Sequence, residues 1–197
     1  MHTSDTTTHL LYLHGFRSSP QSAKAQVMAR LVQTAHPAVT WWCPQLPASP
    51  RQAIDMLLAG IADWPRNRMA VMGSSLGGFY ATWLAQHLNC PAVLINPAVY
   101  PARDLARHIG EHPAWHDPSQ RVFFDAAYID ELAALEAQPR GPVRTLALIA
   151  QGDEVLDWRE MRARHEAGRV HLIEGSDHAL SDFGAYLPEI LEFLHLA

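Results

Sequence analysis

Long apolar runs, clustered basic residues and cysteines are scarce in this sequence of 197 residues. No apolar run approaches the roughly 20 residues that a membrane-spanning helix needs, so we expect no membrane span. The 15 basic residues are scattered and the formal net charge is -5, so we expect no surface that binds nucleic acid. The two cysteines, Cys43 and Cys90, form neither a metal motif nor a disulfide framework, and we expect both to be reduced core thiols.

The amino-terminal segment, residues 1–9, is polar and rich in threonine. It lacks the apolar core of an export signal, so we expect a frayed leader and a cytoplasmic protein. The chain as a whole is 48% hydrophobic and 18% charged, and its length allows one substantial core. We therefore expect a single domain over residues 1–197, and nothing in the sequence indicates an oligomeric state.

Histidine is abundant, with 12 in the chain. His108, His112 and His116 recur every four residues, a spacing that on one helix would face a single metal ion. Pro113 interrupts such a helix, because its ring removes a backbone donor and clashes with the preceding turn. We therefore expect no metal site, and a solvated, irregular segment there.

Short apolar runs alternate with amphipathic segments along the chain. This alternation predicts a doubly wound α/β sheet, mostly parallel, with strand order 2-1-3-4-5-6 and helices on both faces. Ligands of such sheets bind beyond the carboxyl ends of the strands. The predicted strands are Leu10–Leu13, Val39–Cys43, Met69–Met72, Ala92–Ile95, Thr145–Ala150 and Arg169–Ile173. The predicted helices are Ala23–Ala35, Ala53–Ala62, Leu76–Leu88, Trp158–Ala167 and Phe183–Leu196.

One segment, from about residue 99 to 142, is longer than the alternation requires. A crossover between parallel strands needs only about a dozen residues. We predict helices over Asp104–Ile109 and Ala126–Ala137, with a loop between them. We interpret the insertion as a small partial lid over the carboxyl ends of the strands. The alternative is a single crossover helix with additional residues that do not form a lid.

Residues 73–78, which read GSSLGG, join a predicted strand to a predicted helix. A strand, a sharp turn with a serine at its apex and a helix form the nucleophile elbow of the α/β-hydrolase fold. Ser75, and not Ser74, lies midway between two glycines, and such a serine takes a positive φ that side chains rarely allow. The alternative is a glycine-rich turn of some other α/β fold. The glycines that would leave room for this turn are Gly73, Gly77 and Gly78.

A nucleophilic serine needs a histidine base and an acid that orients it, and in this fold the order is serine, acid, histidine. His178 follows the last predicted strand, in a Gly-Ser-Asp turn. Asp153 comes three residues after the preceding strand and is the favoured acid. Asp157 is the alternative acid, although its position before a helix also suits an N-cap. Asp177 is interpreted as a turn former.

A tetrahedral oxyanion needs hydrogen-bond donors, and the loop after the first strand can provide one. That loop reads His14-Gly15-Phe16. We predict that the backbone N–H groups of Phe16 and Leu76 form the oxyanion hole. His14 is predicted to be a structural hydrogen-bonding residue.

Several blocks of sequence, spread from the first strand to the last helix, carry a resemblance to a known family. They are Tyr12–Phe16, Ser18–Lys24, Gly73–Thr82, Ile95–Val99, Gly152–Asp157 and Gly175–Ala179. Together they resemble the YqiA-like esterases, a small bacterial branch of the α/β-hydrolase superfamily. The region Arg103–Arg140 matches least.

The resemblance implies a three-layer α/β-hydrolase fold and hydrolysis of carboxylic esters, or of acyl thioesters, without a cofactor. Carried over by position, Ser75 is the nucleophile, Asp153 the acid and His178 the base. The expected partner is a small-molecule acyl ester or thioester. An acyltransferase, perhydrolase or lyase with the same triad is the enzymatic alternative. A binding protein that retains the fold is the non-enzymatic one.

Overall fold

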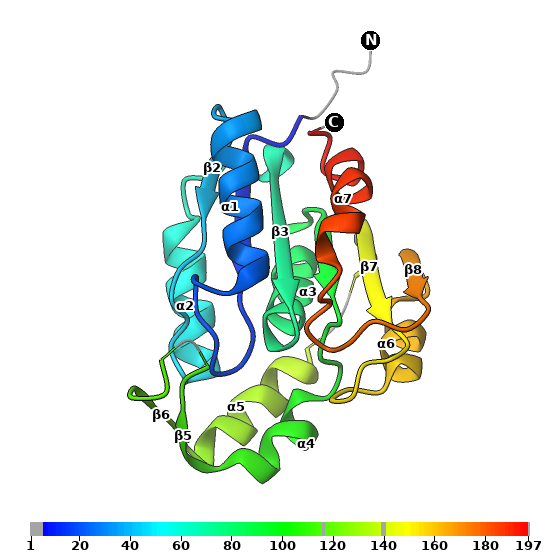
Figure 1. Cartoon of the computed structure of the whole chain (residues 1–197). Coiled ribbons are helices and arrows are strands. Elements are labelled where there is room, and N and C mark those ends of the chain that lie inside the picture. The colour runs from blue at the N-terminus through cyan, green and yellow to red at the C-terminus, as the bar shows by residue number, and fades with distance from the viewer. Residues whose placement is uncertain (1–5, 116, 139–140, 197) are drawn as a thin grey trace.

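A parallel sheet of six strands, in the order β2-β1-β3-β4-β7-β8, forms the centre of the computed structural model, which describes residues 6–115, 117–138 and 141–196 (Figure 1). Counted over the strands of this sheet, the order is the predicted 2-1-3-4-5-6. The strands are β1 (His9–Leu13), β2 (Thr40–Trp42), β3 (Met69–Ser74), β4 (Ala92–Ile95), β7 (Thr145–Ala150) and β8 (Arg169–Ile173).

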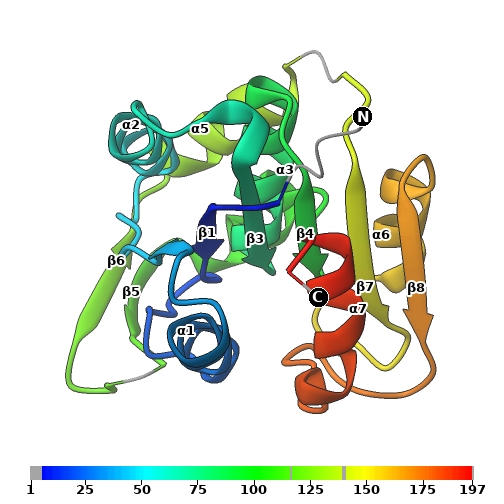
Figure 2. The same cartoon turned by 90° about the horizontal axis from the view of Figure 1, so that it is seen from above.

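Helices cover both faces of the sheet and complete three layers (Figure 2). One face packs against α1 (Ala23–Ala35) and α7 (Leu187–Phe193). The other face packs against α2 (Pro50–Gly60), α3 (Leu76–Leu88), α5 (Ala127–Glu136) and α6 (Trp158–His165). None of the helices described is long and apolar enough to cross a membrane.

The core has two layers because successive side chains of a strand point to opposite faces. In β1, Leu11 and Leu13 pack with α2 and α3, whereas Leu10 and Tyr12 pack with α1. All four side chains are fully buried. Each buried leucine stabilises the fold by roughly 1.5–3 kcal/mol. The strands therefore form a rigid support for the loops at their carboxyl ends.

The insertion lies beyond the carboxyl ends of the strands (Figure 1). It contains α4 (Pro101–Leu105), a 3₁₀ turn η2 (Ala106–His108), strands β5 (Gly110–Pro113) and β6 (Arg121–Phe124), and α5. The two strands pair as an antiparallel hairpin that is separate from the main sheet.

The prediction for the first part of this insertion is wrong in two respects. The helix predicted over Asp104–Ile109 begins earlier, at Pro101, and its last turn is 3₁₀. The segment predicted to be a loop forms the β5–β6 hairpin. Gly110 has a φ of 121°, a conformation that glycine adopts without strain, and it turns the chain out of the helix. Phe124 of β6 is buried and anchors the hairpin to the core.

The helix predicted over Phe183–Leu196 is also shorter than expected. Its first turn is a 3₁₀ helix, η3 (Phe183–Tyr186), and α7 follows with a proline near its start. His195 has a left-handed backbone, and the Leu196 N–H bonds the Leu191 carbonyl at 2.8 Å. This pair of features is typical of a helix end that caps its last carbonyl groups.

Candidate active site

The turn after β3 places Ser75 in the backbone conformation that the motif predicts. Its φ is 56° and its ψ is -123°. A Cβ on Gly77 would lie 2.1 Å from the Leu13 carbonyl oxygen, and one on Gly73 would lie 2.1 Å from the Gly77 oxygen. Real Cβ atoms do not approach backbone this closely. Glycine at both positions is therefore a steric requirement of the turn.

We expect Gly77→Ala to lower the free energy of unfolding by about 3 kcal/mol, because the added methyl group must push α3 away from β1. Chemical denaturation monitored by circular dichroism measures this change. Gly184→Ala is the matched control, since a Cβ there meets nothing within 4 Å. Equal stability of the two variants would contradict the close approach of β1 and α3.

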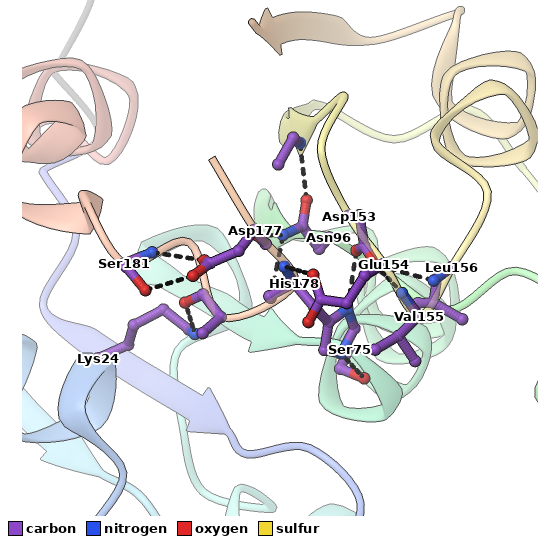
Figure 3. A network of polar contacts seen from close by, with 12 residues as sticks. Lys24, Ser75, Asn96, Asp153, Glu154, Val155, Leu156, Asp177, His178 and Ser181 are labelled. Carbon is purple, nitrogen blue, oxygen red and sulfur yellow. Dashed lines mark hydrogen bonds and ion pairs between the residues drawn. The ribbon is translucent and has the colours of Figure 1, made fainter. Parts of the chain in front are cut away.

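Three side chains from three loops meet in a chain of hydrogen bonds (Figure 3). His178 Nε2 lies 3.0 Å from Ser75 Oγ, and His178 Nδ1 lies 2.7 Å from Asp153 Oδ2. The side chain of Asp153 is completely buried, whereas that of His178 is 20% exposed. The histidine ring can therefore reach both the buried carboxylate and a molecule in solvent.

The Asp153 carboxylate is oriented by its own loop. Its Oδ1 accepts hydrogen bonds from the backbone N–H groups of Val155 and Leu156, each 2.8 Å long. These bonds leave Oδ2 directed at the histidine (Figure 3). Charge-assisted bonds of this kind are short and strong, and they restrict the rotation of the carboxylate.

The two other candidate acids have different partners. Asp157 caps α6, where its carboxylate accepts a 2.9 Å bond from the Arg159 N–H. Asp177 accepts bonds from both the hydroxyl and the backbone N–H of Ser181, and these bonds hold the pKa of Asp177 below its usual value. Neither carboxylate takes part in the Asp153–His178–Ser75 chain.

The loop after β1 packs directly on the serine. A Cβ on Gly15 would lie 3.2 Å from Ser75 Cβ, so only a small residue fits there without displacement. The buried His14 ring fixes the loop: its Nδ1 lies 3.0 Å from the Gly15 oxygen, and its Nε2 accepts a 3.0 Å bond from the Leu46 N–H. Phe16, the residue after Gly15, lines the same cleft as Ser75.

The second predicted oxyanion donor, the Leu76 N–H, lies at the amino terminus of a helix. Leu76 is the first residue of α3, so its N–H has no acceptor within the helix. The aligned dipoles of α3 favour negative charge at this end. Phe16 and Leu76 both line the cleft that contains Ser75.

An open cleft of about 530 Å³ surrounds Ser75 and His178. Leu105 and Trp115 of the insertion line one side, so the insertion borders the cleft. Lys24 lies near the histidine loop; burial lowers its pKa, and the negative charge of Asp177 opposes that shift. Basic and acidic side chains both line the cleft, among them Arg17, Arg107, Asp104 and Glu154.

A hydrogen-bonded link joins the insertion to the loop after β1. Arg17, directly after Phe16, donates from its side-chain Nε to the Pro113 carbonyl at 2.8 Å, and its backbone carbonyl accepts from the Trp115 N–H at 2.9 Å. Its guanidinium lies 4.3 Å from the centroid of the Trp115 ring. The sequence carries no signal for this link, because its partners are about 100 residues apart and three of its four hydrogen-bonding groups belong to the backbone.

Neither cysteine is suited to catalysis. Burial raises the pKa of the Cys43 and Cys90 thiols to about 12, so both are protonated at neutral pH and are poor nucleophiles. Among the described residues, no group of three or more histidine, cysteine, aspartate or glutamate side chains could hold a metal ion. His116, the third member of the histidine series, lies outside the described residues.

Two further residues, Glu154 and Asn96, bond the His178 loop, and the sequence patterns predict no role for either. Glu154 Oε2 accepts a 3.0 Å bond from the His178 N–H. Asn96, at the end of β4, is completely buried and bonds the loop that carries His178. Asn96 falls in the Ile95–Val99 block of the family resemblance, but its place after a buried strand and before a proline predicts a turn rather than a contact.

Solved structures with this topology define the class of fold. A protein of Agrobacterium vitis S4 superposes with a TM-score of 0.77 at 18% identity, covering 98% of this chain and 89% of that one. Est1E from Butyrivibrio proteoclasticus, bound to ferulic acid, gives 0.72 at 12% identity, with coverages of 98% and 89%. Mouse alpha/beta hydrolase domain-containing protein 10 gives 0.68 at 14% identity, with coverages of 95% and 91%. The chain has an α/β-hydrolase fold.

The family is shown by the sequence itself. A family model described as "Uncharacterised protein family (UPF0227)" matches residues 9–195. The chain belongs to this family, which is the YqiA family of the predicted resemblance.

Proposed function

We propose that this protein is a serine hydrolase that cleaves carboxylic esters, with Ser75 as nucleophile, His178 as base and Asp153 as acid. The observation that carries the proposal is the continuous hydrogen-bonded chain from Asp153 Oδ2 through His178 to Ser75 Oγ, with distances of 2.7 and 3.0 Å. A serine hydroxyl is a weak nucleophile, and a neighbouring base that is itself oriented by an acid activates it.

The proposed reaction has two halves. His178 Nε2 takes the Ser75 proton while Oγ forms a bond to the acyl carbon, and the carbonyl electrons move onto the oxygen. The N–H groups of Phe16 and Leu76 stabilise this oxyanion. The carbon–oxygen bond to the alcohol then breaks, and His178 gives its proton to the leaving oxygen. Water repeats the attack on the acyl-enzyme and releases the acid.

The open cleft suits a small acyl substrate. Its lining combines apolar side chains such as Leu105, Val155 and Leu156 with the polar groups of the triad. Est1E, which has the same fold, binds ferulic acid, a carboxylic acid and hence the kind of product that ester hydrolysis releases. An acyl thioester would react by the same steps, with a thiolate as leaving group.

We expect the purified protein to hydrolyse p-nitrophenyl butyrate and to be labelled by a fluorophosphonate on one serine. Release of nitrophenolate measures turnover, and mass spectrometry of the digested adduct locates the label. The expected adduct is on the peptide that contains Ser75. Absence of both turnover and labelling would contradict the proposed function. A panel of acyl chain lengths, with acyl-CoA thioesters included, then defines the substrate.

A further inference from the structure

Asn96 lies where the three loops of the triad meet. It follows β4, the strand between those that precede Ser75 and Asp153, and its side chain is completely buried. It does not line the cleft, so it has no contact with a substrate there. Any effect of Asn96 on catalysis therefore acts through the residues that it holds.

The main chain around Asn96 is bonded to the nucleophile. The Ser75 N–H donates to the Ile95 carbonyl at 3.0 Å, and the Ala98 N–H donates to the Ser75 carbonyl at 3.0 Å. The turn at residues 95–98 thus holds the backbone of Ser75 at both its N–H and its carbonyl group.

The side chain of Asn96 is bonded to the two other loops (Figure 3). Its Oδ1 accepts a 2.8 Å bond from the N–H of Ala150, the last residue of β7 and three residues before Asp153. Its Nδ2 donates to the carbonyl oxygens of Asp177 and His178, at 3.0 and 3.1 Å. One amide group therefore connects the serine turn with the aspartate strand and the histidine loop.

The chemistry of the position selects asparagine. One acceptor and two donors are needed on a short side chain, and a carboxamide is the group that provides both. The φ of Asn96 is 40°, a left-handed conformation that asparagine tolerates better than most residues. An aspartate would keep the acceptor for Ala150 but place negative oxygen against two carbonyl oxygens.

We propose that Asn96 is a positioning residue, which holds the His178 loop in place relative to Ser75 and Asp153. This role rests on the proposed function of the triad. Other side chains hold the same loop from outside: Glu154 accepts from the His178 N–H, and Lys24 donates to the Ala179 carbonyl. Both of these line the open cleft, whereas Asn96 bonds the loop from the buried side.

The test compares Asn96→Gly and Asn96→Asp with the wild-type protein. Both substituted residues tolerate a left-handed backbone, so each variant keeps the turn and loses the donated bonds. Exhaustive labelling by a fluorophosphonate counts the reactive sites, and kcat for p-nitrophenyl butyrate is calculated per labelled site. We expect this kcat to fall about 10²-fold, because a displacement of about 1 Å in a catalytic group has that cost. KM should stay unchanged. The downfield proton NMR signal of the His178–Asp153 hydrogen bond, assigned by its absence in His178→Ala, should weaken or disappear.

Asn89→Gly and Asn89→Asp are the matched controls. Asn89 is exposed, caps the end of α3 and has a φ of 53°, so the same substitutions act on the same backbone conformation away from the triad. We expect wild-type kcat and an intact downfield signal in both. Wild-type kcat per labelled site in the Asn96 variants, or an equal loss in the Asn89 variants, would overturn the proposal. A wild-type protein without ester turnover would remove the proposed function, whereas the NMR comparison would still test Asn96.

Discussion

Ser75→Ala is expected to lower the hydrolysis of p-nitrophenyl butyrate by at least about 10⁴-fold. Alanine removes Oγ, the atom proposed to bond the acyl carbon, and leaves His178 Nε2 without its 3.0 Å partner. The free energy of unfolding should change little, because alanine and serine have similar backbone strain at a φ of 56°. Initial rates at saturating substrate measure the loss, and fluorophosphonate labelling should disappear with it.

The adjacent serine is the matched control for this experiment. Ser74 is the last residue of β3 and is almost completely buried, so Ser74→Ala removes a neighbouring hydroxyl from the same turn. We expect Ser74→Ala to retain labelling on Ser75 and turnover close to that of the wild-type protein. If Ser74→Ala were inactive and Ser75→Ala active, the position of the nucleophile within the elbow would be wrong by one residue.

The main sheet could be predicted because its strands carry a strong local signal. Met69–Met72, Ala92–Ile95 and Leu146–Ala150 are continuous apolar runs, and all of their residues are buried in the structure. A parallel sheet covered on both faces requires such runs. The Gly73 and Gly77 spacing was equally informative, because backbone clashes at the turn exclude larger residues.

The hairpin could not be predicted, because its strands lack such a signal. β5 reads Gly-Glu-His-Pro and has no alternation of apolar and polar residues. Its position comes from tertiary contacts: the Phe16 and Phe124 rings meet edge to face with centroids 5.2 Å apart, and Arg17 bonds Pro113. Contacts between residues about 100 positions apart leave no local periodicity in the sequence.

Candidate site residues divide in the same way. Ser75, Asp153 and His178 each follow a predicted strand, in the chain order that the fold requires, so pattern and chemistry pointed to the same places. Asn96 also follows a predicted strand, but its side chain makes three bonds to backbone groups, one at the end of β7 and two in the His178 loop. Residue type alone does not reveal which backbone groups a buried amide will bond.

Asp153→Asn is expected to lower kcat for p-nitrophenyl butyrate by about 10⁴-fold. The Val155 and Leu156 N–H groups, each 2.8 Å from Oδ1, will hold the amide oxygen of the new asparagine. Its NH₂ group then faces His178 Nδ1 and donates to it. A neutral imidazole that accepts at Nδ1 carries its proton on Nε2, and such a ring cannot take the proton of Ser75. Steady-state kinetics with the same ester measures the loss.

Asp157→Asn makes the same chemical change four residues away. It therefore shows whether Asp153→Asn acts by disturbing the orientation of the His178 ring or by removing a negative charge from the loop. Asparagine caps helices as well as aspartate does, so the bond to the Arg159 N–H and the start of α6 should both persist. We expect kcat close to that of the wild-type protein and an unchanged denaturation midpoint. A severe loss in Asp157→Asn together with an active Asp153→Asn would transfer the role of acid to Asp157. A severe loss in both would mean that negative charge in this loop, and not one oriented carboxylate, supports the histidine.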